Sequence, residues 1–178
     1  MVKIAVIGTA GRDKSQTYTA DLFNRMVVAA KYIMRNLTNI TLISGGAAWA
    51  DHVAVQLFLE GFASKLILCL PCEWKGSQYL DTGVYDWRIN PGRTSNYYHS
   101  EFSTAMNRST LFEIQEAIDK GAEVQIHKGF HNRNSSIANC DYMIAFTWSS
   151  TDVPADGGTL YTWNKCTTTK YHISLTKI

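Results

Sequence analysis

The chain has 178 residues, of which 46% are hydrophobic and 18% charged, and its formal net charge is +2. This length suits one globular domain with its own core, and this composition excludes a disordered chain. So small a net charge gives no argument for a nucleic-acid partner. No apolar run approaches the roughly 20 residues that cross a bilayer. The N-terminal run contains Lys3 and lacks a signal-peptide cleavage site. We therefore expect a cytoplasmic protein with no membrane partner.

Apolar periodicity predicts strands that alternate with helices along the whole chain. Strands are expected at 2–8, 40–44, 65–70, 123–127, 142–148 and 170–175, and helices at 19–35, 47–61, 104–120, 132–139 and 159–166. The segment at about 71–99 is predicted to be a long loop rich in Tyr and Trp, and loops of this length are commonly functional. This order predicts an α/β fold, a Rossmann-like three-layer sandwich with a mainly parallel sheet, as a single domain over 1–178.

The four cysteines give no motif that requires chemistry. Cys69 and Cys72 have the spacing of a redox or zinc motif, but they lie at a predicted strand end without a second pair of ligands. Cys140 and Cys166 stand alone in the sequence. We expect four reduced thiols that serve as buried side chains. The sequence predicts neither a metal site nor a cofactor.

Three loops that contain glycine follow strands, at the edge where open parallel sheets bind ligands. They read Gly8-Thr9-Ala10-Gly11-Arg12, Ser44-Gly45-Gly46-Ala47 and Asp156-Gly157-Gly158-Thr159. A helix N-terminus offers free N–H groups, and glycine allows a close approach, so each loop suits an anion such as phosphate. Each glycine can equally serve only a tight turn. None of the loops has the dinucleotide fingerprint or the P-loop pattern, which argues against an ordinary NAD dehydrogenase or P-loop ATPase.

Charged residues near these loops are further candidates. Arg12 and Arg133 are the expected phosphate ligands, with Arg93 as a weaker third, because a guanidinium group binds phosphate oxygens bidentately. Asp51 is expected in the first turn of a helix, where it either accepts hydrogen bonds from ribose hydroxyls or ties down the neighbouring loop. Asp156 can instead be the N-cap of the last helix.

His99 and Glu101 form the carboxylate–histidine pair nearest to the expected loop. An enzyme that cleaves a glycosidic bond needs such a group within hydrogen-bond reach of its substrate, so both are candidate catalytic residues. The alternative is a capped helix end. Aromatic side chains of the same region can stack on a base, form a small core or form a subunit interface: Trp74, Tyr79, Tyr85, Trp87, Tyr97 and Tyr98.

The run from Ser44 to Asp51 resembles one ligand-binding element of the SLOG superfamily, and Asp141 with Gly157-Gly158-Thr159 and Thr162 resembles the other. That superfamily includes DNA-processing proteins and LOG-type phosphoribohydrolases. The resemblance covers most of the chain and is closest to an uncharacterised microbial and viral subgroup that shares Asn96-Tyr97-Tyr98-His99, Gly129-Phe130 and Arg133-Asn134. It implies a Rossmann-like homo-oligomer that binds nucleotide-derived ligands and, in some branches, cleaves an N-glycosidic bond.

Two positions depart from the superfamily pattern. Trp49 stands where glycine is usual, which would narrow the pocket or give a base a stacking surface. Thr162 stands where LOG-type hydrolases carry their catalytic glutamate. This second departure moves the prediction from phosphoribohydrolase catalysis towards binding.

Taken together, these patterns predict a protein that binds a nucleotide or ribose-phosphate, as a sensor or with N-glycosidic hydrolase or transferase activity. The alternatives are a single-stranded nucleic-acid binding protein of the DNA-processing type and a ligand-free structural or assembly protein. The predicted ligand-binding residues are Gly8, Thr9, Gly11, Arg12, Ser44, Gly45, Gly46, Ala47, Asp51, Arg133, Asn134, Asp156, Gly157, Gly158 and Thr159.

Overall fold

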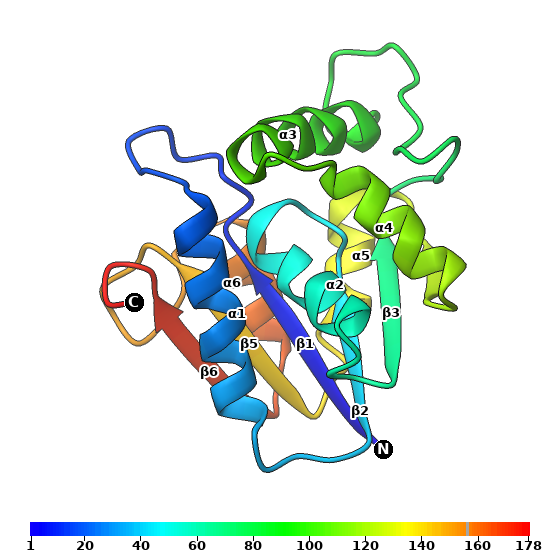
Figure 1. The fold of residues 1–178 in the computed structure, drawn as a ribbon. Coiled ribbons are helices and arrows are strands. Elements are labelled where there is room, and N and C mark those ends of the chain that lie inside the picture. The colour runs from blue at the N-terminus through cyan, green and yellow to red at the C-terminus, as the bar shows by residue number, and fades with distance from the viewer. Residues whose placement is uncertain (156) are drawn as a thin grey trace.

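The computed structural model of the protein describes residues 1–155 and 157–178 (Figure 1). One six-stranded sheet, in the order β4-β3-β2-β1-β5-β6, runs through this part of the chain, and every neighbouring pair is parallel. The strands are β1 (Val2–Gly8), β2 (Ile40–Ser44), β3 (Lys65–Leu70), β4 (Glu123–Ile126), β5 (Tyr142–Thr147) and β6 (Thr169–Ser174). The predicted α/β fold with its parallel sheet is confirmed, and the expected strand bounds are correct to within one residue.

Helices cover both faces of the sheet, which makes three layers (Figure 1). The helices are α1 (Ala20–Met34), α2 (His52–Leu59) after a short 3₁₀ turn (Trp49–Asp51), α3 (Pro91–Met106), α4 (Thr110–Asp119), α5 (Gly129–Ile137) and α6 (Gly158–Lys165). Side chains of α1, α2 and α4 build the larger core, and α5 and α6 build the smaller one on the other face. No helix in the described part of the chain combines the length and apolar character that crossing a bilayer requires.

Strand β1 supplies both cores. Ile4 and Val6 point into the larger core, whereas Ala5 and Ile7 point into the smaller one. Successive side chains of a strand point to opposite faces, so a strand buried on both faces must be apolar throughout. This is the reason why the continuous apolar runs of the sequence identify the strands so well.

The segment between β3 and β4 differs from the sequence-based expectation. The predicted loop at 71–99 ends at Asn90, whose side chain accepts a hydrogen bond from the backbone N–H of Arg93, and Pro91 begins α3. The predicted helix at 104–120 is two helices, because Asn107 adopts a left-handed backbone with φ 52° and ends α3. Ser109 then caps the start of α4. Capping side chains set these bounds, which apolar periodicity does not detect.

The direction of strand order reverses at β1, because β2 lies on one side of it and β5 on the other. In register, Val6 lies opposite Ser44 on β2, and Gly8 lies opposite Phe146 on β5. The loops that follow these three strands therefore meet at one edge of the sheet. Open α/β sheets bind ligands at such a switch point.

Candidate functional site

A cavity of about 760 Å³ opens at the carboxyl ends of β1 and β5. Its volume lies within the range of small-molecule binding sites. The cavity is lined by these predicted ligand-binding residues: Gly8, Thr9, Arg12, Ala47, Asp51, Arg133, Asn134, Gly157, Gly158 and Thr159. Sequence segments more than 100 residues apart thus meet around one space.

Other predicted ligand-binding residues lie behind the cavity wall. The Ser44 hydroxyl donates to the backbone carbonyl of Asp51 over 2.8 Å and accepts the N–H of Gly46 over 3.0 Å, so it holds the turn after β2 in shape. Gly11 lies against the ring of Trp49, whose Nε1 would be only 2.7 Å from a Cβ at this position. Asp156 lies outside the described residues.

The helices α5 and α6 beside the cavity begin without a side-chain cap, as α2 also does after its 3₁₀ turn. α6 begins after Gly157 and α5 after Lys128, and neither residue provides a side-chain cap. By contrast, α1, α3 and α4 each begin at a capping Thr, Asn or Ser. The first N–H groups of a helix have no partner within the helix, so without a side-chain cap those that are not bound elsewhere remain available to an anion. In α5 the N–H of Gly129 is bound elsewhere, since it donates to the carbonyl oxygen of Pro71 over 2.8 Å. Both uncapped ends carry residues of the cavity wall, such as Phe130 and Gly158.

Arg133 is held on α5 by three hydrogen bonds. Its Nη1 donates to the carbonyl oxygen of Gly45 over 3.0 Å, and its Nε and Nη2 donate to the Asn134 side chain over 3.2 and 3.1 Å. All of these acceptors are neutral. A guanidinium group has five N–H donors, so two of them remain for a ligand.

Arg12 follows the loop after β1 and is exposed. Its guanidinium carbon lies 5.3 Å from the ring centroid of Tyr98 and 5.7 Å from that of Phe130, within cation–π range. Among the described residues, neither Arg12 nor Arg133 forms an ion pair with a carboxylate. The cavity therefore presents two arginines without a directly paired carboxylate.

Asp51 is a buried acid in the cavity wall, with 4% of its surface exposed. Its Oδ2 has no hydrogen-bond partner among the described residues. Burial raises the pKa of this carboxyl group, while Arg133 and the backbone N–H groups of Ala47, Gly45 and Gly8 oppose that shift. A Cβ on Gly45 would lie 2.5 Å from Oδ2 and 2.8 Å from Cζ of Arg133, so only glycine lets these two side chains approach here.

The structure does not bring the expected acid/base pair to the cavity. His99 is fully buried, and burial lowers its pKa to about 3. Glu101 lies at the surface, where it pairs with Lys14 over 3.1 Å. Residues two apart on a helix point in different directions, so α3 separates these two side chains. Neither lines the cavity.

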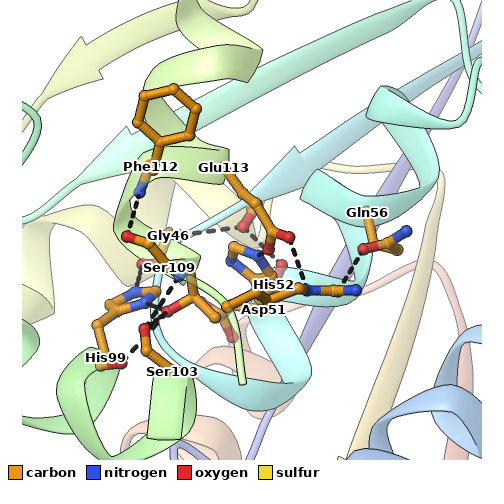
Figure 2. Close-up of polar contacts among 12 residues, drawn as sticks. Gly46, Asp51, His52, Gln56, His99, Ser103, Ser109, Phe112 and Glu113 are labelled. Atoms are coloured by element: carbon orange, nitrogen blue, oxygen red, sulfur yellow. Dashed lines mark hydrogen bonds and ion pairs between the residues drawn. The ribbon is translucent and has the colours of Figure 1, made fainter. Parts of the chain in front are cut away.

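His99 instead hydrogen-bonds to the turn that follows β2 and lies outside the cavity wall (Figure 2). Its Nε2 lies 2.9 Å from the carbonyl oxygen of Gly46, which also accepts the hydroxyl of Tyr79. Its Nδ1 lies 2.8 Å from the Thr110 hydroxyl, which is linked in turn to Ser103 over 2.9 Å. A carbonyl only accepts hydrogen bonds, so Nε2 carries the proton and Nδ1 accepts from Thr110.

A second buried histidine joins α2 to α4 (Figure 2). The Nε2 of His52 lies 2.7 Å from Glu113, and the other Glu113 oxygen lies 2.7 Å from Nε of Arg108. Arg108 also donates to Gln56 over 2.7 Å. Burial lowers the pKa of His52, although Glu113 opposes the shift. The imidazole is therefore neutral and donates to the Glu113 carboxylate. This hydrogen bond holds α2 and α4 together.

Trp49 has neither of its expected roles. It is 2% exposed, packs against Tyr18 and Phe102 at centroid distances of 5.1 and 4.4 Å, and does not line the cavity. Its φ of 63° lies in the left-handed region, a conformation that glycine adopts without steric cost. The ring therefore fills the core beneath the loops.

The aromatic residues of the irregular segment divide between two environments. Trp74 and Tyr79 pack into or against the larger core, and Nε1 of Trp74 donates to Gln115 over 2.7 Å. Trp87 is 43% exposed and lines the cavity. Arg93, the third predicted phosphate ligand, lies over the ring of Tyr85 and outside the cavity wall.

Sequence reasoning missed several residues of the cavity wall. Phe130 and His131 follow Gly129 in the first turn of α5, and Trp148 follows β5. The glycine before Phe130 is the signal that could have identified the start of α5 as a fourth strand-end loop. The weak apolar pattern of α5 placed the helix start three residues too late.

The four cysteines are free thiols, of which Cys72 is half-buried and the others are buried. Cys140 and Cys166, far apart in sequence, have their Sγ atoms 3.8 Å apart at the C-terminal end of α6. Burial is the main reason why the pKa of Cys140 rises to about 12. Over residues 1–155 and 157–178, no three His, Cys, Asp or Glu side chains are placed to hold a metal ion.

Comparison with known proteins gives one informative relative. The chain is 37% identical over 173 residues to "Uncharacterized protein R261" of Acanthamoeba polyphaga mimivirus, a match that covers 92% of this chain and 90% of the viral protein. The chain belongs to the same family as this viral protein. No protein-family model matches the chain, and no solved structure matches it.

Proposed function

We propose that the protein binds a nucleotide-derived or ribose-phosphate ligand in the cavity at the ends of β1 and β5, as a ligand-binding member of the SLOG superfamily. One observation carries this proposal. The uncapped starts of α5 and α6 and two arginines without a carboxylate partner all face the same cavity. Helix N-termini and guanidinium groups both favour anions, and phosphate matches their geometry.

Aromatic side chains of the cavity wall suit the other half of such a ligand. The Trp87 ring comes from the irregular segment, and its exposed face can stack on a base. Base stacking on an aromatic side chain contributes about 1–3 kcal/mol in single-strand binding proteins. Phe130 and Trp148 add apolar surface to the same cavity.

The chemistry of the cavity supports binding more than hydrolysis. The hydroxyl of Thr162 donates to the carbonyl oxygen of Gly158 over 2.8 Å, so it is engaged within its own helix. Asp13 and Asp51 are the carboxylates of the described cavity wall. Asp13 bonds to Ser15 rather than facing a ligand, and Asp51 is almost entirely buried. Burial keeps Asp51 from solvent, and the hydrogen bonds from Ser15 lower the pKa of the exposed Asp13, which disfavours the protonated form that a general acid needs.

Calorimetric titration with adenosine, AMP and ADP-ribose tests the proposal. We expect AMP or ADP-ribose to bind and adenosine to bind at least about tenfold more weakly, because a charged hydrogen bond contributes about 1.5–3 kcal/mol. Arg133→Gln should weaken binding by a similar factor. The matched control is Arg25→Gln, because Arg25 lies on α1 and pairs with Asp21. Absence of binding by every nucleotide would refute the proposal. Tight binding of a single-stranded oligonucleotide with steep salt dependence would favour the nucleic-acid alternative.

A further inference from the structure

The two arginines of the cavity belong to different structural units. Arg12 follows the loop after β1, whereas Arg133 lies on α5 and is anchored to the loop after β2 through Gly45. Arg133 has hydrogen bonds from three of its nitrogens, so its position is fixed beside that second loop. The two guanidinium groups are therefore held by different elements of the fold.

Each arginine also has its own uncapped helix start. The Thr159 hydroxyl donates to the carbonyl oxygen of Gly8 over 3.1 Å, which joins the start of α6 to the loop that carries Arg12. Arg133 lies on α5 itself, one turn from the start of that helix. We call Thr9, Arg12 and Thr159 the Arg12 subsite, and Ala47, Arg133 and Asn134 the Arg133 subsite. All six residues line the cavity.

The ring of Phe130 lies beside both subsites. Its centroid is 5.7 Å from the guanidinium carbon of Arg12 and 5.2 Å from that of Arg133. The ring therefore occupies space next to both cations and offers them no negative charge. A guanidinium group binds one phosphate bidentately, so two separately held arginines match two phosphoryl groups better than one.

Asp51 provides an independent sign of a ligand. Its Oδ2 is buried without a partner among the described residues, and the side chain lies in the cavity wall near Arg133. A buried polar atom without a hydrogen bond costs about 1–3 kcal/mol. A sugar hydroxyl satisfies a carboxyl group in either protonation state, because it both donates and accepts. A sugar hydroxyl on the Arg133 side of the cavity would therefore suit the Asp51 carboxyl group.

We propose that the ligand carries two phosphoryl groups on separate atoms of one sugar, one bound at the Arg12 subsite and one at the Arg133 subsite. This inference rests on the proposed function and assigns its ligand class. A nucleoside 3′,5′-bisphosphate is the simplest compound of this kind. Two adjacent phosphoryl groups, as in a nucleoside diphosphate, would instead concentrate their charge at one subsite.

Calorimetry on the full chain tests the inference with 5′-AMP, 3′-AMP, ADP and adenosine 3′,5′-bisphosphate. We expect the bisphosphate to bind about 10- to 100-fold more tightly than either monophosphate, since a second charged contact contributes about 1.5–3 kcal/mol. ADP should show a smaller gain in affinity over 5′-AMP. If the bisphosphate binds no more tightly than the better monophosphate, or if ADP matches it, the inference is wrong while the proposed function stands. If none of the four compounds binds, the proposed function fails with it.

Variants of the two arginines give a second test, in which each variant should weaken the binding of a different monophosphate. Arg12→Gln should reduce the affinity of the bisphosphate to that of one monophosphate and leave that monophosphate unaffected, and Arg133→Gln should do the same for the other. Arg12 makes no hydrogen bond within the described residues, so its variant should fold normally. Arg133→Lys serves if loss of the contacts to Gly45 and Asn134 destabilises the glutamine variant. Equal losses of both monophosphates in each variant would show a single shared subsite and overturn the inference.

Discussion

The Nε2 of His99 lies 2.9 Å from the carbonyl oxygen of Gly46, so a side chain of α3 fixes the turn that follows β2. A trans peptide holds its C=O and the next N–H on opposite sides. Fixing the Gly46 carbonyl towards α3 therefore turns the N–H of Ala47 the other way, and Ala47 lines the cavity. A residue outside the cavity thus sets the orientation of a backbone donor that acts on Asp51 in the cavity wall.

Two variants of His99 should distinguish the contribution of its hydrogen bonds to stability from that of its packing volume. His99→Leu removes the hydrogen bonds of the imidazole to the Thr110 hydroxyl and to the Gly46 carbonyl, and we expect it to destabilise the protein by about 1–3 kcal/mol. His99→Gln can keep a donor near the position of Nε2 and should cost less. Thermal unfolding measures both, with about 2–4 °C expected per kcal/mol for a chain of this size. Equal losses in the two variants would show that the hydrogen bond to Gly46 is unimportant.

Acid should weaken the fold through the same histidine. Its pKa is lowered to about 3, from an ordinary value of 6.5, because burial disfavours the charged form. The unfolded chain therefore binds more protons than the folded one between these values, so this contribution is full above pH 6.5 and is lost as the pH falls towards 3. Urea unfolding from pH 7 to pH 4 should show the stability advantage of wild type over His99→Gln shrinking. A constant difference would mean that His99 does not titrate in this way.

Asp51 should have the opposite pH dependence. Burial raises its pKa above the ordinary value of 3.8, so its contribution to stability is present below that value and is lost as the pH rises through the folded-state pKa. Asp51→Asn removes the ionisation and should raise the melting temperature at pH 8 by a few degrees, since an unsatisfied buried polar group costs about 1–3 kcal/mol. The gain should disappear near pH 3. The control is Asp152→Asn, at an exposed position, for which we expect no change.

Asn107 tests the boundary between α3 and α4. Its φ of 52° is left-handed, a conformation that glycine adopts without steric cost. We expect Asn107→Gly to stabilise the protein by up to about 1 kcal/mol and Asn107→Ala to destabilise it by a similar amount. Differential scanning calorimetry of the two variants measures this. If alanine were neutral, the helix would continue through this position, as apolar periodicity alone predicts.

Much of the fold could be predicted from the sequence, because the parallel strands are buried on both faces. Continuous apolar runs such as Leu66–Leu70 are typical of strands buried on both faces of a sheet. The break after Met106 could not be found in this way, since apolar residues continue through Leu111 and Ile114 on the next helix. A single left-handed Asn and a capping Ser made that break.

The candidate site was predictable in part, because loops at parallel strand ends must converge whatever their side chains do. The burial of His99 was not predictable, since a histidine beside tyrosines reads equally well as a lid residue. The contact between Arg133 and Gly45 joins residues 88 positions apart and leaves no local pattern. Side-chain direction and long-range contacts were the missing information.

Backbone NMR of the labelled protein with adenosine 3′,5′-bisphosphate or AMP tests the central claim most directly, because it locates a ligand as well as detecting it. Saturable shift changes should concentrate on the amides of Thr9, Ala47, Gly158 and Thr159, which line the cavity. Amides of β6 and the exposed face of α1 should remain unchanged. Changes confined to those distant elements, or no changes at millimolar nucleotide, would contradict the account.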